Sequence, residues 1–278
     1  MKLLLVGCEH RVSQALTTRL DAPEFDLLTL TSAELERIEF KSLFVNKASK
    51  RPDAIISTPT INSANLSFRR RLQLTDVYKK LCAFAKEHSL PLLHLSNLRV
   101  FDGSQSQAYT EQDKPQPRGV EAQVWRRWET LVQKQVAQHI IIRPSWVLTP
   151  ESEQLASELL LLAAAEVDAG SLLQARVNPT SAEDMARVLD AILRQLWAGA
   201  RAWGIYHYGG METTDTKKLL DNMQKNVRVP HHHITQLSIA EQENELNACV
   251  DCHKILYAFG IQQHPWRGAM QPNIKDLE

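Results

Sequence analysis

The sequence has no excess of charge of either sign. Its 278 residues include 32 Lys and Arg and 32 Asp and Glu, so the formal net charge is zero when histidine is neutral. A chain without a net charge has no long-range attraction for nucleic acid or for an anionic membrane surface. We therefore expect neither nucleic acid nor a membrane as a partner.

Long apolar runs are also missing. The longest, Leu159–Ala165, is far shorter than the roughly 20 residues that a membrane-spanning helix needs. The run Leu3–Val6 ends at Gly7, which makes it too short for the core of a signal peptide. Four cysteines without an export signal are typical of reduced thiols. We expect a soluble, cytoplasmic protein.

The composition that is present is that of a globular protein. Hydrophobic residues make up 44% and charged residues 23% of the chain, and its length suffices to bury a sizeable core. Short apolar runs rich in β-formers alternate with stretches of helical periodicity, which indicates a parallel sheet with right-handed helical crossovers. The expected strands are 3–6, 26–30, 54–57, 90–95, 140–143 and 204–207, and the expected helices are 12–20, 68–88, 120–138 and 182–196.

The pattern changes after Pro150. Residues 155–167 have the spacing of a helix, 177–180 resemble an irregular connector, and from Met211 onward we expect helices and loops. We predict a Rossmann-like α/β fold with a doubly wound parallel sheet and a smaller C-terminal lobe of the substrate-binding type. The first domain would span 1–148, its sheet completed by about 181–209, and the second lobe with the returning elements would span 149–278.

Short motifs spread over the whole chain share their order and spacing with one known family. They are Lys2–Gly7, Arg51–Asp53, Pro91–Ser96, Val100–Gly103, Tyr109–Glu111, Pro117, Arg143–Val147, Asn178–Ser181, Gly204–His207, Phe259–Ile261 and Pro265–Arg267. In these the chain resembles the dTDP-4-dehydrorhamnose reductase branch of the extended short-chain dehydrogenase/reductases. The resemblance implies a sugar-nucleotide-binding protein with a Rossmann fold that uses NADP(H) or NAD(H).

The glycine-rich turn of that family is only partly present here. The first glycine is Gly7, but the second falls on His10 and the third on Ser13. A side chain at His10 would take space that a cofactor pyrophosphate needs at the helix N-terminus, whereas Ser13 mainly affects helix–strand packing. After the second expected strand, Thr31 and Ser32 offer hydroxyls where NAD-binding relatives carry an acidic residue. We therefore predict weakened cofactor binding, with a plain strand–helix turn favoured.

The catalytic positions that the resemblance implies are all substituted. The general-acid Tyr falls on Glu121, its partner Lys on Trp125, and the Ser or Thr that polarises the carbonyl on Asn97. Tyr109 lies in the acidic loop before the helix and has no Lys four residues later. We therefore expect no ordinary reductase activity, although Glu121 could act as an acid or base if it were desolvated.

The motif Cys249–His253 matches the attachment pattern of c-type haem. Haem attachment needs export and a small helical domain, so a chance match is favoured. Zinc bound by Cys249, Cys252 and His253 together with the run 231–233 is a minority hypothesis, and we predict no metal. Arg176 and Asn178 fall where the family meets its nucleotide-sugar, but the surrounding Asp-Gln-x-Gly pattern is lost.

Three functions remain open from the sequence. The first is a catalytically degenerate relative that acts as a binding, scaffold or regulatory protein. The second is a divergent NADP-linked reductase or epimerase of a nucleotide-sugar. The third is a protein-interaction module with a filled cofactor cleft. Another protein, a nucleotide-sugar and a second copy of the chain accordingly stay open as partners.

Overall fold

A computed structural model describes residues 1–38, 51–59, 61, 66–148, 175–216, 218–219, 222 and 247–267. Its centre is a six-stranded sheet in the order β2-β1-β3-β4-β5-β9, in which each pairing is parallel. The strands are β1 (Lys2–Val6), β2 (Asp26–Leu30), β3 (Ala54–Ser57), β4 (Leu92–Leu95), β5 (His139–Pro144) and β9 (Gly204–Tyr208). The predicted α/β class with a doubly wound parallel sheet is confirmed.

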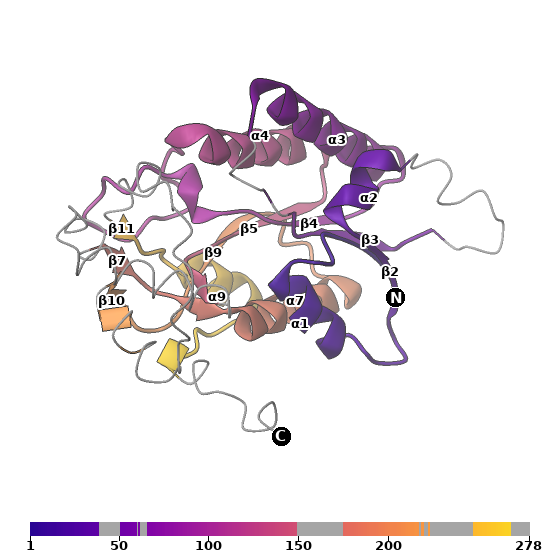
Figure 1. Cartoon of the computed structure of the whole chain (residues 1–278). Coiled ribbons are helices and arrows are strands. Elements are labelled where there is room, and N and C mark those ends of the chain that lie inside the picture. The colour runs from indigo at the N-terminus through magenta and orange to yellow at the C-terminus, as the bar shows by residue number, and fades with distance from the viewer. Residues whose placement is uncertain are drawn as a thin grey trace, which may run out of the picture.

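Helices cover both faces of this sheet (Figure 1). On one face α3 (Phe68–Glu87) packs beside α4 (Gly119–Gln135), and on the other α1 (Arg11–Arg19) packs beside α7 (Ala182–Trp197). The short α2 (Ser32–Arg37) follows β2, and α9 (His253–Phe259) packs against β9 and α7. The sheet is therefore shielded from water on both sides, which explains why Leu3, Leu4, Leu5 and Val6 of β1 are all apolar and fully buried.

The helices begin at residues suited to that position. Ser181 caps α7 by accepting a hydrogen bond from the amide of Asp184 at 3.1 Å, and acidic residues occupy the first turn. Thr31 and Glu34 form a reciprocal capping box at the start of α2. Such caps satisfy amides that have no partner within the helix, so these boundaries follow from local sequence chemistry.

The strand order reverses between β1 and β3. Val6 of β1 is in register with Leu30 of β2 on one side and with Ser57 of β3 on the other. Open α/β sheets bind ligands at such a switch point, beyond the carboxyl ends of the strands. The turn that begins at Gly7 lies at this position.

Short strands make up two further sheets. A three-stranded sheet joins β7 (Arg176–Val177), β10 (Thr214–Asp215) and β11 (Asn247–Ala248), and a two-stranded one joins β6 (Val147–Leu148) and β8 (Thr180–Ser181). The connector expected at 177–180 is therefore a link between two strands, and the C-terminal part contains strands besides α9. Strands of two residues have no readable periodicity, which is why the sequence did not indicate them.

Part of the prediction for the second half lies outside the described residues, including the helix expected at 155–167. Both β9 and α7 come after residue 148 but belong to the main sheet and its helical layer. The division of the chain into domains stays a prediction.

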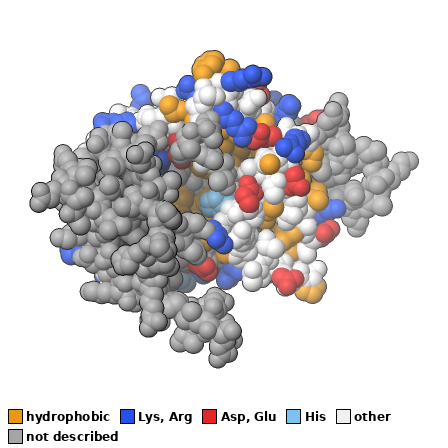
Figure 2. Space-filling view, in the orientation of Figure 1, with side chains coloured by type: hydrophobic (Ala, Val, Ile, Leu, Met, Phe, Trp, Pro, Cys, Tyr) orange, Lys and Arg blue, Asp and Glu red, His pale blue; other side chains and the backbone are white. Residues whose placement is uncertain are grey.

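Within the part of the chain that the structure describes, each helix is too short or too polar to cross a bilayer. On the face drawn in Figure 2, the described acidic and basic side chains are interspersed over the surface. This mixing agrees with the zero net charge of the sequence.

Candidate functional site

Gly7 occupies a position that only glycine can hold. Its φ is +83°, and a Cβ atom there would lie 2.1 Å from the carbonyl oxygen of Thr58. The backbone of the turn can approach the end of β3 so closely because no side chain intervenes. The first glycine of the family turn is thus present both in the sequence and in its steric role.

His10 takes the place of the second glycine and caps α1. It has extended backbone geometry, and its Nδ1 accepts a hydrogen bond from the amide of Val12 at 3.2 Å. In dinucleotide-binding turns the amides at this helix N-terminus hold the cofactor phosphates. In this chain an imidazole of the protein already accepts from one of them.

Ser13, at the third glycine position, is a packing residue. Its side chain is fully buried, and its hydroxyl hydrogen-bonds the hydroxyl of Thr58. Thr58 in turn donates to the carbonyl of Gly7 at 3.0 Å. Ser13 therefore ties α1 to the end of β3, and its side chain is directed into the interior of the protein.

The carboxylates of Glu9 and Glu34 lie at the end of β2, where the sequence led us to expect only the hydroxyl groups of Thr31 and Ser32. Glu9 accepts hydrogen bonds from the amide of Ser32 at 3.0 and 3.2 Å, and Glu34 accepts one from the hydroxyl of Thr31 at 2.9 Å. Burial raises the pKa of the neighbouring Cys8, with further contributions from these two carboxylates. Sequence reasoning missed Glu9 because it comes from the turn after β1, a different segment of the chain.

Two of the substituted catalytic positions, Glu121 and Trp125, contact each other. The carboxylate of Glu121 accepts a hydrogen bond from the indole Nε1 of Trp125 at 3.2 Å and pairs with Arg99 at 3.0 Å. Asn97 accepts from the amide of Arg99 at 2.9 Å and so caps the short helix Leu98–Val100. Glu121 and Trp125 are therefore in direct contact, and Asn97 is connected to them through Arg99, a cation that sequence reasoning did not identify.

These residues do not fit a nicotinamide dinucleotide held in the manner of the family. Trp125 is buried, with its ring 5.3 Å from that of Trp128, and it supplies no ammonium group for a ribose. Glu121 has no phenolic hydroxyl to donate, and its carboxylate is already bonded to two neighbours. Because His10 also caps α1, the misfit affects both the phosphate end and the nicotinamide end of the expected site.

Glu129, Arg143 and Ser96 form a buried ionic network on α4, β5 and the end of β4. Arg143 of β5 donates to both carboxylate oxygens of Glu129 at 2.8 Å, and Ser96 donates to one of them at 2.7 Å. Burial acts to raise the pKa of Glu129, but the hydrogen bonds and charge of Arg143 outweigh it, so the pKa is lowered. In the sequence, this network was indicated only by Arg143, a basic residue at the end of the otherwise apolar strand expected at 140–143.

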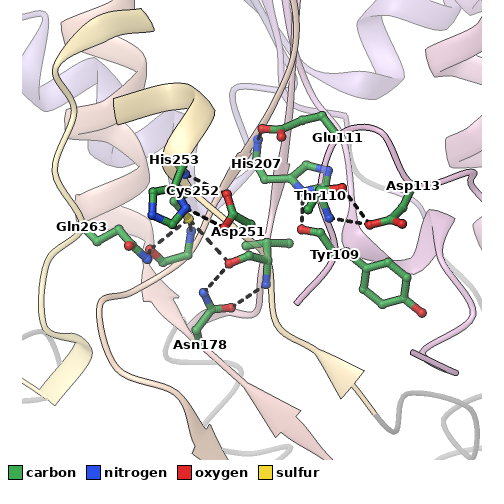
Figure 3. Close-up of polar contacts among 12 residues, drawn as sticks. Tyr109, Thr110, Glu111, Asp113, Asn178, His207, Asp251, Cys252, His253 and Gln263 are labelled. Atoms are coloured by element: carbon green, nitrogen blue, oxygen red, sulfur yellow. Dashed lines mark hydrogen bonds and ion pairs between the residues drawn. The ribbon is translucent and has the colours of Figure 1, made fainter. Parts of the chain in front are cut away.

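His207 connects this network to the loop before α4. Its Nδ1 lies 2.9 Å from the carbonyl of Tyr109, and its amide donates to Glu111 at 2.8 Å (Figure 3). Its Nε2 lies 3.5 Å from a guanidinium nitrogen of Arg143. Burial, helped by the charge of Arg143, lowers the pKa of His207 to about 3. Burial raises the pKa of Glu111. The hydroxyl of Tyr109 donates to Asp102 at 3.2 Å, so it forms a hydrogen bond within the loop before α4.

The two residues predicted to meet a nucleotide-sugar have different surroundings. Asn178 is buried and makes a reciprocal pair of 3.0 Å hydrogen bonds with the backbone of Val250 (Figure 3). Arg176 is exposed and donates to the carbonyl of Ser106 at 3.2 Å. Asn178 thus joins two chain segments, and only Arg176 faces solvent.

The C-x-x-C-H motif holds free thiols. Cys249 and Cys252 are buried, and Cys252 Sγ accepts a hydrogen bond from the amide of Gly209 at 3.2 Å. Burial raises the pKa of Cys252 to about 12, while His253 is exposed and pairs with Asp251 (Figure 3). Among the described residues, no three His, Cys, Asp or Glu side chains are grouped to hold a metal ion. The histidine run 231–233 lies outside those residues.

Known proteins of similar sequence and structure match this chain over nearly its whole length. The dTDP-4-dehydrorhamnose reductase of Aggregatibacter actinomycetemcomitans is 26% identical in an alignment of 296 positions, gaps included, that covers 99% of this chain and 98% of the relative. The enzyme of the same name from Sinorhizobium fredii is 23% identical and covers 96% of this chain and 94% of its own. A crystal structure of a dTDP-4-dehydrorhamnose reductase from Clostridium acetobutylicum superposes with a TM-score of 0.74 at 16% identity, over 100% of this chain and 99% of that one.

The family model described as the RmlD substrate binding domain matches residues 1–278. This match spans the Rossmann-like sheet as well as the smaller sheets. The chain therefore belongs to the RmlD substrate binding domain family, the dTDP-4-dehydrorhamnose reductase-like branch of the extended short-chain dehydrogenase/reductases.

Proposed function

We propose that this chain is a member of its family that no longer carries out hydride transfer and acts as a binding, scaffold or regulatory protein. The observation that carries the proposal is the hydrogen bond between Glu121 and Trp125, at the positions of the general acid and its lysine partner. The proposal concerns the chemistry of the site, because family membership alone does not fix the reaction.

The chemistry of that pair is unlike that of a tyrosine and a lysine. An ammonium group four residues from a tyrosine lowers the pKa of the phenol and holds the ribose of the cofactor. An indole has no charge and can only donate a hydrogen bond, which here goes to Glu121. Arg99 supplies a positive charge, but that charge is balanced by the same carboxylate. Glu121, Trp125 and Arg99 are thus suited to holding one another in place and not to transferring a proton.

Solved structures of proteins with this fold contain nucleotide ligands. The Bacillus anthracis dTDP-4-dehydrorhamnose reductase has been crystallised in complex with NADP, and the Bordetella bronchiseptica enzyme WbmG with NAD and UDP. For this chain we propose a nucleotide-sugar or a protein as the ligand. The dinucleotide, by contrast, meets His10 at the phosphate end and Trp125 at the ribose end.

A divergent NADP-linked reductase or epimerase is the second candidate. It is favoured by the end-to-end match with reductases, 26% identical over 99% of this chain. In such an enzyme the carboxylate of Glu121 would take over proton transfer, with Arg99 beside it. A pure protein-interaction module differs from both in requiring no nucleotide of any kind.

The test is a turnover assay with NADPH and NADH and dTDP-4-dehydrorhamnose, followed by absorbance at the nicotinamide band. We expect no oxidation above background from the purified chain, while a family reductase in parallel shows it. An E121A variant tests the carboxylate, and E183A, on the exposed first turn of α7, serves as the matched control. Steady NADPH oxidation that is lost in E121A and kept in E183A would refute the proposal in favour of the divergent enzyme.

A further inference from the structure

We propose that Glu9 and His10 are an internal occupant of the dinucleotide cleft, and that Glu9 discriminates against a ribose carrying a 2′-phosphate. The inference rests on the proposed function, since it names the residues that keep this family member from using a dinucleotide. It concerns two side chains in the turn after β1, where the second glycine of the family pattern falls on His10. It assigns a role to two neighbours that the reaction chemistry leaves unused.

The turn directs its two side chains to different elements. His10 bends forward onto α1 and accepts from the amide of Val12 at 3.2 Å. Glu9 reaches across to the residue after Thr31 and accepts from the amide of Ser32 through both oxygens, at 3.0 and 3.2 Å. A dinucleotide at a switch point lays its diphosphate over the first turn and its adenosine ribose over the end of the second strand. Glu9 and His10 together cover both places.

The charges at this edge oppose a phosphate. Glu34 accepts from the amide of Thr31 at 2.8 Å, close to the amide that Glu9 accepts from. A phosphate on the ribose would therefore approach two carboxylates. Like charges repel, so each carboxylate weakens the binding of a phosphate at this position. A ribose with a free 2′-hydroxyl can instead donate a hydrogen bond to a carboxylate.

Ser13 provides the internal contrast. It also replaces a family glycine, but its hydroxyl is turned inward onto Thr58 and its side chain is fully buried. Restoring glycine at Ser13 should leave the cleft as it is, whereas restoring it at His10 removes a group that faces the helix N-terminus. The two substitutions restore the same residue type at positions three residues apart, and they differ in the direction in which the original side chain points.

The experiment is isothermal titration of ADP, NADH and NADPH into the wild-type chain and the H10G, S13G and E9Q/H10G variants. We expect ADP to bind H10G at least about tenfold more tightly than wild type, and S13G to behave as wild type. Adding E9Q to H10G should tighten NADPH by about a further tenfold and change NADH by less than about threefold, because one repelling charge is removed. Thermal unfolding of each variant establishes that it is folded.

Three results would overturn the inference. One is wild-type protein that binds these ligands as tightly as H10G does. The second is a folded H10G that gains nothing, with H10A as the substitute if the glycine variant does not fold. The third is an equal response of NADH and NADPH to E9Q. Turnover by wild type would refute the proposed function instead, whereas tight NADPH binding without turnover would refute only this inference.

Discussion

Glu129 and Arg143 form an ion pair that is almost wholly removed from water. Their side chains are 0% and 1% exposed, and two parallel hydrogen bonds of 2.8 Å join them. Removing two charges from water costs several kcal/mol, which such geometry and further bonds from Ser96 and Arg126 offset. Each charge therefore depends on the other for its place in the core.

Replacing Glu129 by leucine should destabilise the fold by about 3–5 kcal/mol, because the guanidinium of Arg143 is left buried without its counter-charge. The E129L/R143M double variant should lose less than the two single variants together. Urea unfolding followed by tryptophan fluorescence measures both. The exposed pair Asp76 and Lys79 is the control, since D76A should not shift the midpoint resolvably. Additive single effects would show that the pair is not coupled.

At the scale of elements, Asn178 connects the end of β7 with the segment before α9. Its amide group imitates a backbone pair, since it both donates to and accepts from Val250. Val250 also forms an isolated parallel bridge with Tyr109. Three segments far apart in the sequence thus meet at Val250, which joins the end of β7 through Asn178 and the loop before α4 through Tyr109.

An N178A variant should lose about 2 kcal/mol of unfolding free energy, because the buried amide and carbonyl of Val250 lose their partners. R176A, two residues earlier but exposed, should change stability by less than about 0.5 kcal/mol. Thermal unfolding of the two variants, measured under the same conditions, tests this difference in stability. If both were equally stable while nucleotide-sugar binding was lost in N178A alone, Asn178 would be a ligand contact and not a structural link.

The main elements were predictable because their signals are local. All six strands of the central sheet were identified from apolar runs bounded by breakers, and α3 and α7 to within a residue at each end. The two-residue strands were not, since pairing with distant segments creates them. At the site, motif spacing identified Gly7, His10 and Ser13. Glu9 and Arg99 escaped because their partners, Ser32 and Glu121, lie 22 or 23 residues away.

For the molecule as a whole, two buried histidines make stability depend on pH. Burial lowers the pKa of His94 to about 4 and, with help from Arg143, that of His207 to about 3. Both values lie below the unfolded value of about 6.5. The folded state therefore binds fewer protons than the unfolded state, so this stability is complete above about pH 6.5 and is lost as the pH falls toward the folded values.

We expect the unfolding free energy to fall by about 1.4 kcal/mol per pH unit for each of these histidines between about pH 6 and pH 4. Urea unfolding at half-unit steps measures the slope. H94Q should remove one such contribution and flatten the curve, whereas H253Q, at an exposed position, should leave it unchanged. The same slope in H94Q as in wild type would show that His94 is not the group that titrates.

The pairing of α1 with α7 has a consequence for the newly made chain. Arg19 of α1 meets Asp190 of α7 at 3.5 Å, and 171 positions separate them. At about 5–20 residues per second, a ribosome needs roughly 10–35 s to deliver the second helix after the first. During that interval the side of α1 that packs against α7 in the folded protein has no cover. The nascent protein should therefore be a client of ribosome-associated chaperones until its last third emerges.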